Sequence, residues 1–500
     1  MRQLTSLDSQ FLALETPRQS GHVASVAILD TSTTPTGTLT LADIQSLIAE
    51  RLPLLPPLRW RLQEVPLGLD YPYWVDDVDF DLDFHVRELA LPSPGSDEQL
   101  AEQVARIVSR PLDRAKPLWE LYLIGGLASG HTAMLTKIHH AVIDGMSGAE
   151  ILGLLLDLTP EIRELEVPAH WGDDELVPGT LGMLARGGLG ATRYPLRALR
   201  ALPSTIPNLD ETQLRAIPGV ASLGRLANRA QRALTRQDAP VATQDRLVAP
   251  KTSFNGRVSA HRRFAFGQLS LDDVKAVKNA YGVTVNDVIV TLCAGAVRRW
   301  LMAHEELPDA TLVAQIPVSV RTEEQIGTYG NRIMLMGAQL FTDEPDPVRR
   351  LQRTHDALGD MKQRHRALPA DLLTDANHFI PPAVFSRAAR LTFALATSGR
   401  PIWNLVISNV PGPQFPLYCA GARLVANYPV SVITDGMGLN ITVMSYCGHL
   451  DFGIVADREQ MPDVALLMGW LEEELAELLP RAPKARAKPK PKPKAKRTAA

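Results

Sequence analysis

Apolar residues recur along the chain with two different periods, and together these periods predict a mixed α/β protein. Segment 132–140 alternates between apolar and polar positions, which is typical of a half-buried strand, and 23–28 is also predicted to be a strand. In 96–107 the apolar residues recur every three or four positions, so that Leu100 and Val104 share one face of a predicted helix. Both kinds of element occur in each half of the chain, which favours an α/β or α+β fold class.

Residues suited to the N-cap position stand before several of the helical patterns, which places the helix starts. Predicted helices cover 40–51, 96–107, 270–282, 284–303, 346–366, 382–397 and 462–479. Predicted strands in the second half cover 312–320, 333–341, 405–409, 423–432, 439–446 and 449–455.

Composition divides the chain into two mixed halves and a different middle segment. Ala, Leu, Arg, Gly and Pro dominate the middle, which predicts amphipathic helical pieces at 183–200 and 223–234 rather than strands. We predict an N-terminal domain at 1–170, a helical interdomain connection at 171–250, a C-terminal domain at 251–480 and a disordered basic Lys/Pro/Ala tail at 481–500. The connection is either a helical linker that packs on the protein or an interfacial segment that touches lipid.

The formal net charge of −3 conceals a separation of charge. Nine of the 52 Lys and Arg residues lie in the last 20 residues, which carry no acid, so the other 480 residues hold 43 basic and 55 acidic side chains. The tail is a solubilising extension, an attachment to anionic lipid head groups or a nonspecific nucleic-acid contact. The acidic body shows no nucleic-acid-binding motif, which favours lipid among the binding partners.

Several classes of protein are disfavoured by what the sequence lacks. No run of about 18 apolar residues occurs and the N-terminus lacks the apolar core of a signal peptide, so we expect a cytoplasmic protein without a transmembrane helix. The three cysteines are odd in number and widely spaced, which argues against a disulfide framework or a thiolate metal site. No glycine-rich phosphate loop follows a predicted strand, which argues against nucleotide hydrolysis and hydride transfer.

The stretch from His139 to Gly145 reads His-His-x-x-x-Asp-Gly and carries the candidate chemistry. Such a pattern is expected by chance on the order of once per thousand chains of this size. Histidine is the usual residue for moving one proton per turnover near neutral pH. Neighbouring side chains of a strand point to opposite faces, so only one of the two histidines is expected to face a reacting atom. Asp144 would hold the following loop.

Four interpretations of these histidines compete. A metal site needs converging ligands, which diverging histidines do not supply. A serine hydrolase needs an exposed nucleophile, and no Gly-x-Ser-x-Gly elbow is present. A lone general base that activates a hydroxyl toward an activated acyl donor requires only the imidazole and positioning. Taken alone, the motif is also explained by two histidines that end a core strand.

Further motifs show that the sequence resembles the bacterial wax ester synthase/diacylglycerol acyltransferase family. The matching blocks span most of the chain and occur in the family's order. They are 4–12, 111–120, 139–145, 285–288, 317–321, 408–413 and 438–442 with 451–453. The resemblance implies a chloramphenicol acetyltransferase-like fold, with two related α/β domains and a substrate tunnel between them.

The resemblance also implies roles for individual residues. His140 is the implied general base and Asp144 mainly holds the motif loop, with His139 and Gly145 as supporting residues. In related enzymes that aspartate pairs with an arginine, for which Arg321 is the candidate here because it follows a strand of the other domain.

Two other blocks are candidate substrate-binding residues with structural alternatives. Pro117, Leu118 and Trp119 match the family's Pro-Leu-Trp block, and the alternative is a core aromatic residue under a turn. Asn286 and Asp287 match its Asn-Asp pair, and as first-turn helix residues they are also explained by capping. The block 451–453 is expected to be structural and distant from the chemistry.

The expected function is an acyl-CoA-dependent O-acyltransferase that uses no cofactor and no metal. Its partners would be a long-chain acyl-CoA, a diacylglycerol or long-chain fatty alcohol, and a membrane or lipid-droplet surface that it contacts peripherally from the cytoplasm, with no specific nucleic acid. One alternative is a condensation-type acyltransferase that takes its acyl group from a carrier protein. Another is a non-catalytic lipid-droplet surface protein.

Overall fold

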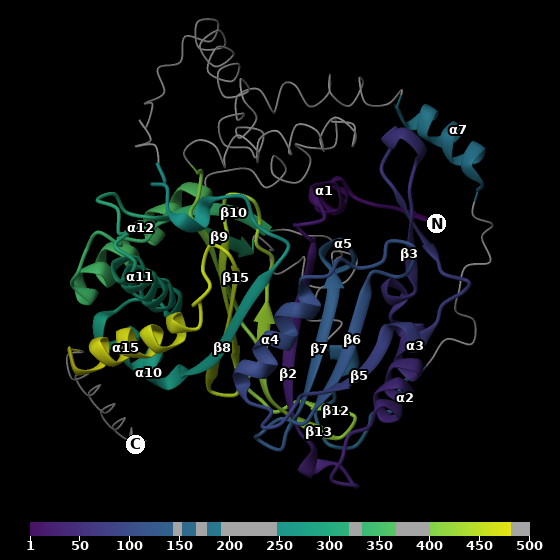
Figure 1. Ribbon diagram of the computed structural model, residues 1–500, viewed down its shortest axis with the longest axis horizontal. Coiled ribbons are helices and arrows are strands. Elements are labelled where there is room, and N and C mark those ends of the chain that lie inside the picture. The colour runs from purple at the N-terminus through teal and green to yellow at the C-terminus, as the bar shows by residue number, and fades with distance from the viewer. Residues whose placement is uncertain (144–152, 167–177, 192–247, 320–332, 367–400, 482–500) are drawn as a thin grey trace, which may run out of the picture.

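The computed structural model describes residues 1–143, 153–166, 178–191, 248–319, 333–366 and 401–481. Two six-stranded sheets form the centre of this described part, and helices cover them (Figure 1). A third sheet of three short strands extends the N-terminal half. Its order is β1-β4-β3, with β1 at Arg2–Gln3, β3 at Trp60–Gln63 and β4 at Tyr73–Asp76.

The first six-stranded sheet carries the histidine motif. Its strand order is β12-β13-β2-β7-β6-β5. The bounds are β2 His22–Asp30, β5 Val86–Ala90, β6 Trp119–Gly125, β7 Thr132–His139, β12 Tyr418–Cys419 and β13 Ala422–Val430. All of its pairs are antiparallel except β5 with β6.

The second sheet is built from the C-terminal half. Its strand order is β10-β9-β11-β14-β15-β8. The bounds are β8 Arg262–Ser270, β9 Val313–Ser319, β10 Ile333–Gln339, β11 Leu405–Val410, β14 Leu439–Tyr446 and β15 His449–Asp457. Here β11 pairs in parallel with both β9 and β14, and the other pairs are antiparallel.

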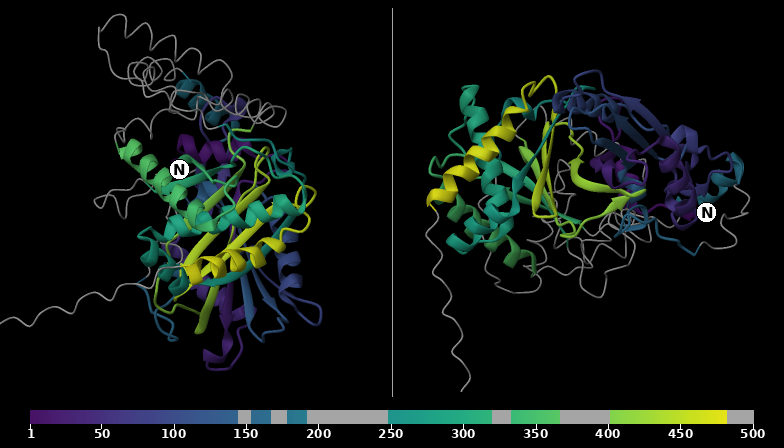
Figure 2. Two further views of the ribbon diagram at one scale, coloured as in Figure 1. Left: turned by 90° about the vertical axis from the view of Figure 1, so that its left-hand side faces the viewer. Right: turned by 90° about the horizontal axis from the view of Figure 1, so that it is seen from below.

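Helices lie on the outer faces and at the junction of the sheets. Those with the N-terminal half are α1 Ser6–Leu14, α2 Leu41–Arg51, α3 Leu82–His85, α4 Asp97–Val108, α5 His140–Ile143 and α7 Thr180–Ala191. Those with the C-terminal half are α10 Leu271–Tyr281, α11 Val285–Ala303, α12 Pro347–Arg366 and α15 Leu466–Arg481. Figure 2 shows the second group packed on the side of the second sheet that faces away from the first.

One strand joins the two halves. Although β13 comes late in the chain, it pairs with β2 of the first sheet and also packs against β15 of the second. A Cβ atom on Gly453 would lie 1.6 Å from the Pro429 carbonyl oxygen, so only glycine permits this approach. The buried Asp451 carboxylate accepts a hydrogen bond of 2.7 Å from the backbone nitrogen of Asn427. The 451–453 block therefore anchors the crossing strand.

A shared core fills the space between the sheets. It contains Val104 of α4, Val26 of β2, Phe264 of β8 and Val455 of β15, all of them buried. Burial of apolar area contributes roughly 25 cal/mol per Å². The two halves are therefore held together by packing as well as by the crossing strand.

Most predicted helices and strands are present, and their observed ends lie at most four residues from the predicted ends. The strand predicted at 132–140 ends at His139, and His140 begins a helical turn instead. The last helix begins at Leu466 rather than at 462, and the piece predicted at 183–200 is described only as α7. The predicted helices at 223–234 and 382–397 lie outside the described residues. The domain boundaries stay a prediction, since each falls in or beside a segment outside that part.

Within the described residues no single helix has the length and hydropathy of a membrane span. The helices α10 and α11 satisfy that test together, but a bend of 105° separates them. Most of α11 is buried in the core of the C-terminal half.

Candidate active site

The two histidines of the motif lie where β7 turns into α5. His139 is the last residue of β7, and its backbone nitrogen donates a hydrogen bond of 2.9 Å to the Leu118 carbonyl. The backbone nitrogen of His140 donates to the Gly21 carbonyl, also over 2.9 Å. Because the chain changes from strand to helix between them, the two rings leave the backbone in different directions and meet different partners.

His140 is held against the first helix of the chain. Its ring stacks on Phe11 of α1, with ring centroids 4.0 Å apart and ring planes inclined by 14°. The residue as a whole is partly exposed, unlike His139, which is buried. One face of the imidazole is covered by the phenyl ring.

Burial, together with the neighbouring His139, lowers the pKa of His140 to about 4. A hydrogen bond to the residue's own backbone carbonyl and the Asp8 carboxylate oppose this shift. A carbonyl only accepts, so the ring nitrogen that contacts it carries the proton and the other nitrogen keeps a lone pair. At neutral pH the ring is therefore an uncharged base.

His139 has a different environment and is 1% exposed. Its Nδ1 accepts a hydrogen bond of 3.1 Å from the backbone nitrogen of Ala141. Its Nε2 lies 3.2 Å from Oε1 of Glu15, a contact whose alignment is not that of a full hydrogen bond. A Cβ atom on Gly21 would lie 2.7 Å from that Nε2, so the site needs glycine there. His139 thus faces protein groups.

The Pro-Leu-Trp block supports the motif from the adjacent strand. Leu118 is fully buried and supplies the carbonyl that pairs with His139. The Nε1 atom of Trp119 donates to the Leu58 carbonyl over 2.7 Å, and its indole stacks on His85 at 4.5 Å. Pro117 is buried beside them. Core packing therefore accounts for these three side chains, and direct contact with substrate stays a prediction.

The Asn-Asp pair begins α11. Asp287 forms a capping box with Thr284, and its Oδ2 lies 2.7 Å from Nδ1 of His355. Asn286 accepts a hydrogen bond of 3.4 Å from Nδ2 of Asn409 at the end of β11. The structure brings these two family blocks together. Local capping accounts for Asp287, and a substrate contact for either residue stays a prediction.

Asp144, Gly145 and Arg321 lie outside the described residues. The proposed pairing of Asp144 with Arg321 therefore stays a prediction. The described part of the motif ends at Ile143, in the first turn of α5.

A small, open pocket lies where the two halves meet. Ser20, His22 and Val108 line it from the N-terminal half, Arg262 and Val455 from the second sheet, and 430–433 from the segment that follows the crossing strand. His22 is the register partner of His139 across β2 and β7. The pocket therefore adjoins the strands that carry the motif.

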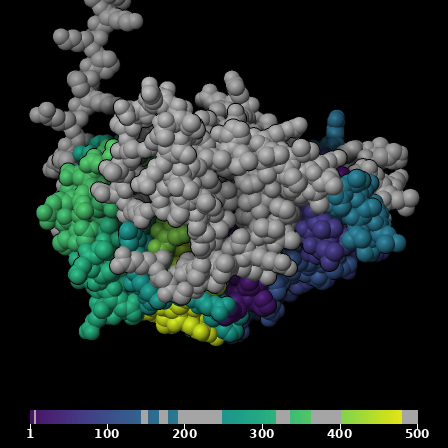
Figure 3. Space-filling model, turned by 90° about the horizontal axis from the view of Figure 1, so that it is seen from above, coloured from purple at the N-terminus to yellow at the C-terminus, as the bar shows by residue number. Residues whose placement is uncertain are grey.

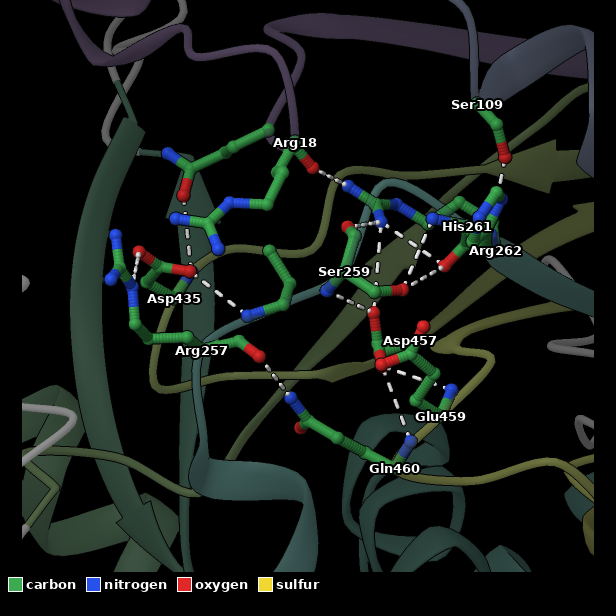
Figure 4. A network of polar contacts seen from close by, with 12 residues as sticks. Arg18, Ser109, Arg257, Ser259, His261, Arg262, Asp435, Asp457, Glu459 and Gln460 are labelled. Carbon is green, nitrogen blue, oxygen red and sulfur yellow. Dashed lines mark hydrogen bonds and ion pairs between the residues drawn. The ribbon is translucent and has the colours of Figure 1, made fainter.

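Polar contacts close the junction beside this pocket, as Figure 4 shows. The Arg262 guanidinium donates to the Arg18 carbonyl over 2.5 Å and to the Ser259 carbonyl over 2.7 Å, and it lies 3.8 Å from the Asp457 carboxylate. Its backbone nitrogen donates to the Ser109 hydroxyl over 3.1 Å. One arginine of the second sheet thus ties two loops of the N-terminal half to the C-terminal half.

His22 adds an uncharged polar group to the pocket lining. Burial and the cation of Lys137 together lower its pKa to about 3. Its Nε2 lies 2.8 Å from the Val108 carbonyl, so that nitrogen carries the proton. Its Nδ1 is buried and has no hydrogen-bond partner among the described residues. That nitrogen can accept a hydrogen bond from a bound molecule.

Three residues around the motif had no role in the predicted site. Phe11 and Arg114 lie inside blocks that match the family, but nothing in the pattern of those blocks assigns them a contact. Glu15 lies just beyond the first block. All three are distant from the histidines in sequence, and only the folded structure brings them near the motif. An alignment of related sequences is the signal that would single them out.

Among the described residues, no group of three or more His, Cys, Asp or Glu side chains is placed to hold a metal ion. The site instead presents a neutral imidazole in the half that a crossing strand joins to the second mixed sheet. This fold and this site define an acyltransferase with the two-domain chloramphenicol acetyltransferase-like architecture, as predicted.

Comparison with protein families agrees. The wax ester synthase/diacylglycerol acyltransferase catalytic domain matches residues 4–289, and the C-terminal domain of the same family matches residues 329–479. The chain therefore belongs to this family and is an acyltransferase, which confirms the predicted family and enzyme class.

Individual relatives cover nearly the whole chain. A putative diacylglycerol O-acyltransferase of Mycobacterium tuberculosis is 37% identical, with 96% of this chain and 90% of that protein aligned. The O-acyltransferase WSD of Acinetobacter baylyi is 32% identical over 95% of this chain and 96% of that protein. The solved wax ester synthase/diacylglycerol acyltransferase of Marinobacter aquaeolei superposes with a TM-score of 0.67 at 30% identity, covering 96% of this chain and 100% of the other.

A more remote likeness concerns the fold alone. The first condensation domain of the calcium-dependent antibiotic synthetase superposes with a TM-score of 0.51 at 15% identity, over 97% of this chain and 98% of that domain. The architecture therefore also occurs in enzymes with other substrates, and the site must be argued from its own residues.

Proposed function

We propose that this protein transfers a long acyl group from a coenzyme A thioester to the hydroxyl of a diacylglycerol or of a long-chain fatty alcohol, with His140 as general base. The observation that carries the proposal is the state of that ring. It is uncharged at neutral pH, keeps one lone pair and belongs to a residue that is partly exposed. No cofactor is required, because the thioester is already activated.

The reaction follows from this single base. The imidazole takes the proton of the acceptor hydroxyl while the oxygen attacks the thioester carbonyl. The tetrahedral intermediate then collapses, its C–S bond breaks, and the departing sulfur receives the proton from the imidazolium. The products are an ester and free coenzyme A, and the ring returns to its neutral form. A base of this kind contributes about 10²–10⁴-fold to the rate.

The names of the relatives support this choice of acceptors. One is called a diacylglycerol O-acyltransferase, and the superposed structure is called both that and a wax ester synthase. Either acceptor presents a primary or secondary hydroxyl on a long apolar chain, so the same base serves both.

Product analysis with competing acceptors tests the proposal. Purified protein receives palmitoyl-coenzyme A with equal amounts of a diacylglycerol and hexadecanol, and the esters are separated and counted. We expect triacylglycerol, wax ester or both, and a loss of at least about 10²-fold in H140A. The matched control H449A changes an exposed histidine at the start of β15 and should retain activity. Activity of H140A within a few-fold of the unaltered protein contradicts the mechanism.

The donor is tested in the same assay. Palmitoyl-coenzyme A is replaced by a palmitoylated acyl-carrier protein at equal concentration. A preference for the carrier-bound donor would favour the condensation-type alternative over the coenzyme A reaction.

We also propose that the protein works on a lipid surface from the cytoplasm, which would bring it to its apolar acceptor. The support is a set of exposed apolar side chains, the α7 patch, made up of Leu181, Leu184 and Leu189 on α7 and Leu67 on the turn that packs against this helix. These side chains are 84%, 39%, 68% and 81% exposed. Gly187 and Gly190 lie on the opposite side of α7 against Val65 and Asp70, so its leucines are left facing outward. Figure 3 shows α7 in blue at the margin of the molecule.

A further inference from the structure

Three charged or ionisable groups form a chain behind the imidazole of His140. Arg114 contacts Oε2 of Glu15 with two nitrogens, Nη2 at 2.7 Å and Nε at 3.1 Å. The other oxygen of Glu15, Oε1, accepts 2.8 Å from the backbone nitrogen of Gly21 and lies 3.2 Å from Nε2 of His139. Both oxygens of this carboxylate are therefore occupied, and they link α1, the strand β2 and the motif.

The contacts of His139 determine where its proton lies. A backbone N–H group can only donate, so the Nδ1 atom that accepts from Ala141 carries no proton. The proton of the ring is then on Nε2, beside the carboxylate of Glu15. This is the neutral tautomer, and its orientation is fixed at both nitrogens. Protonation of Nδ1 would break the contact with Ala141.

Both backbone contacts around His140 lead back to Glu15. On one side, His140 donates to the carbonyl of Gly21, whose own nitrogen donates to Glu15. On the other side, the ring of His139 holds the nitrogen of Ala141, the residue after His140. The turn that carries the reacting ring is thus held from two directions by one carboxylate.

We propose that Glu15, anchored by Arg114, is a positioning residue for acyl transfer: it keeps His139 in its Nε2-protonated form and so fixes the turn that presents His140. Glu15 does not contact the reacting atoms. The inference rests on the proposed role of His140 as general base.

The ionisation of Glu15 agrees with this role. Burial acts to raise its pKa, but the contacts with His139, Gly21 and Arg114 outweigh burial and lower the pKa to about 2. The carboxylate therefore stays charged at any pH at which the imidazole is a useful base. A hydrogen bond in which one partner is charged is roughly twice as strong as a neutral one, so the anchor is firm.

The substitution E15Q keeps the size of the side chain and changes only its hydrogen bonding, so it tests positioning without creating a cavity. In E15Q one of the two ends of the side chain becomes an NH₂ donor. Turned toward His139, this donor forces the proton of the ring onto Nδ1 and breaks the contact with Ala141. Turned toward Arg114, it faces another donor and weakens the anchor. Either orientation loosens the turn without removing His140.

The test compares E15Q with E64Q on steady-state kinetics with palmitoyl-coenzyme A. Glu64 contacts the same arginine at 3.4 Å but is exposed at 66% and does not contact His139. We expect kcat of E15Q to fall about 10- to 100-fold while KM for the thioester changes less than about threefold, and E64Q to behave as the unaltered protein. E15D, which restores the charge on a shorter stem, should recover part of kcat.

A spectroscopic measurement reports the tautomer directly. With ¹⁵N-labelled histidine, the unaltered protein should show a buried neutral ring protonated at Nε2 that disappears in H139Q. In E15Q that signal should shift toward the Nδ1-protonated form or broaden. A purely structural glutamate would lower the melting temperature without moving this signal.

Three outcomes overturn the inference: kcat of E15Q within threefold of the unaltered protein, a rise in KM with kcat unchanged, or an unaltered His139 signal in E15Q. Should E15Q fail to fold, the variant R114K provides the test, because a lysine cannot keep both nitrogen contacts with Glu15. A kcat of R114K within twofold of the unaltered value would then contradict the proposed anchoring of Glu15 by Arg114. Full activity of H140A would instead refute the proposed function, so the two failures are distinguishable.

Discussion

Phe11 and His140 lie face to face, with their ring centroids 4.0 Å apart. The two residues come from opposite ends of the N-terminal half, and α1 places the phenyl ring. A capping box between Thr5 and Asp8 fixes the start of that helix. The stack covers one face of the imidazole and excludes water from it. This contact is one physical reason for the lowered pKa of the ring.

The substitution F11L tests this relationship. Leucine leaves part of the imidazole face open to water, which favours the protonated form, so the pKa of His140 should rise from about 4 toward 6.5. A general base acts only when unprotonated, so activity should be lost at higher pH than in the unaltered protein. The measurement is the acid limb of kcat/KM against pH. F415L, which changes an exposed ring of the other half, is the control. An unmoved acid limb in F11L contradicts the prediction.

The two histidines should differ in the size of their effect. H140A removes the proposed base, whereas H139A removes only the side chain that holds Ala141 and contacts Glu15. We expect a loss of about 10- to 50-fold in kcat for H139A, against at least about 10²-fold for H140A. Turnover of both variants under identical conditions checks this. An equal or larger loss in H139A would mean that the wrong imidazole has been assigned as the base.

The sequence alone predicted the family, the mixed fold and most elements, because strong periodicity and capping residues define these locally. The sequence also singled out the two histidines. It did not distinguish their surroundings, since the change from strand to helix at His140 depends on contacts with Gly21 and α1. Glu15 and Arg114 were missed for the same reason. A carboxylate gains its role here from three partners that are remote along the chain, and no local pattern records such partners.

Acid should destabilise the protein partly through His22. Burial and Lys137 lower its folded pKa to about 3, whereas the unfolded side chain titrates near 6.5. Between these values the unfolded chain binds more protons than the folded one, so the stabilising effect is complete above pH 6.5 and is lost as the pH falls toward 3. His140 acts in the same direction between pH 6.5 and about 4, and Glu15 does so between pH 4.5 and about 2.

The variant H22Q should therefore have a smaller dependence of its free energy of unfolding on pH between 6.5 and 4. Glutamine can still donate to the Val108 carbonyl but has no proton to gain. Chemical denaturation at several pH values measures the slope, with the exposed-site variant H449Q as the comparison. Equal slopes in H22Q and the unaltered protein would show that His22 does not couple folding to pH.

Capping and substrate contact make different predictions for Asp287. The structure accounts for this carboxylate by its capping box with Thr284 and its ion pair with His355. We therefore expect D287N to lose stability by about 1 kcal/mol or more, as for a lost N-cap, while KM for both substrates stays within about twofold. T284A removes the same cap from the other side and serves as the matched variant. A large rise in KM with little change in melting temperature would instead assign Asp287 to the substrate site.

The α7 patch makes the lipid-surface proposal testable without touching the site. Leu67 and Leu181 are more than four-fifths exposed, and replacing them with serine removes apolar area that a lipid surface would bury. Each buried leucine contributes about 1.5–3 kcal/mol, so L67S/L181S should bind vesicles at least about tenfold more weakly. Flotation with phosphatidylcholine vesicles measures this, and adding anionic lipid reports the separate contribution of the basic tail.

M302S changes an exposed apolar residue at the end of α11 and should bind normally. Activity on a short-chain alcohol dissolved in water should be unchanged in L67S/L181S, because α7 lies at the margin of the N-terminal half, apart from α5, which His140 begins (Figure 1). Equal flotation of the double variant and M302S would show that this surface does not contact lipid.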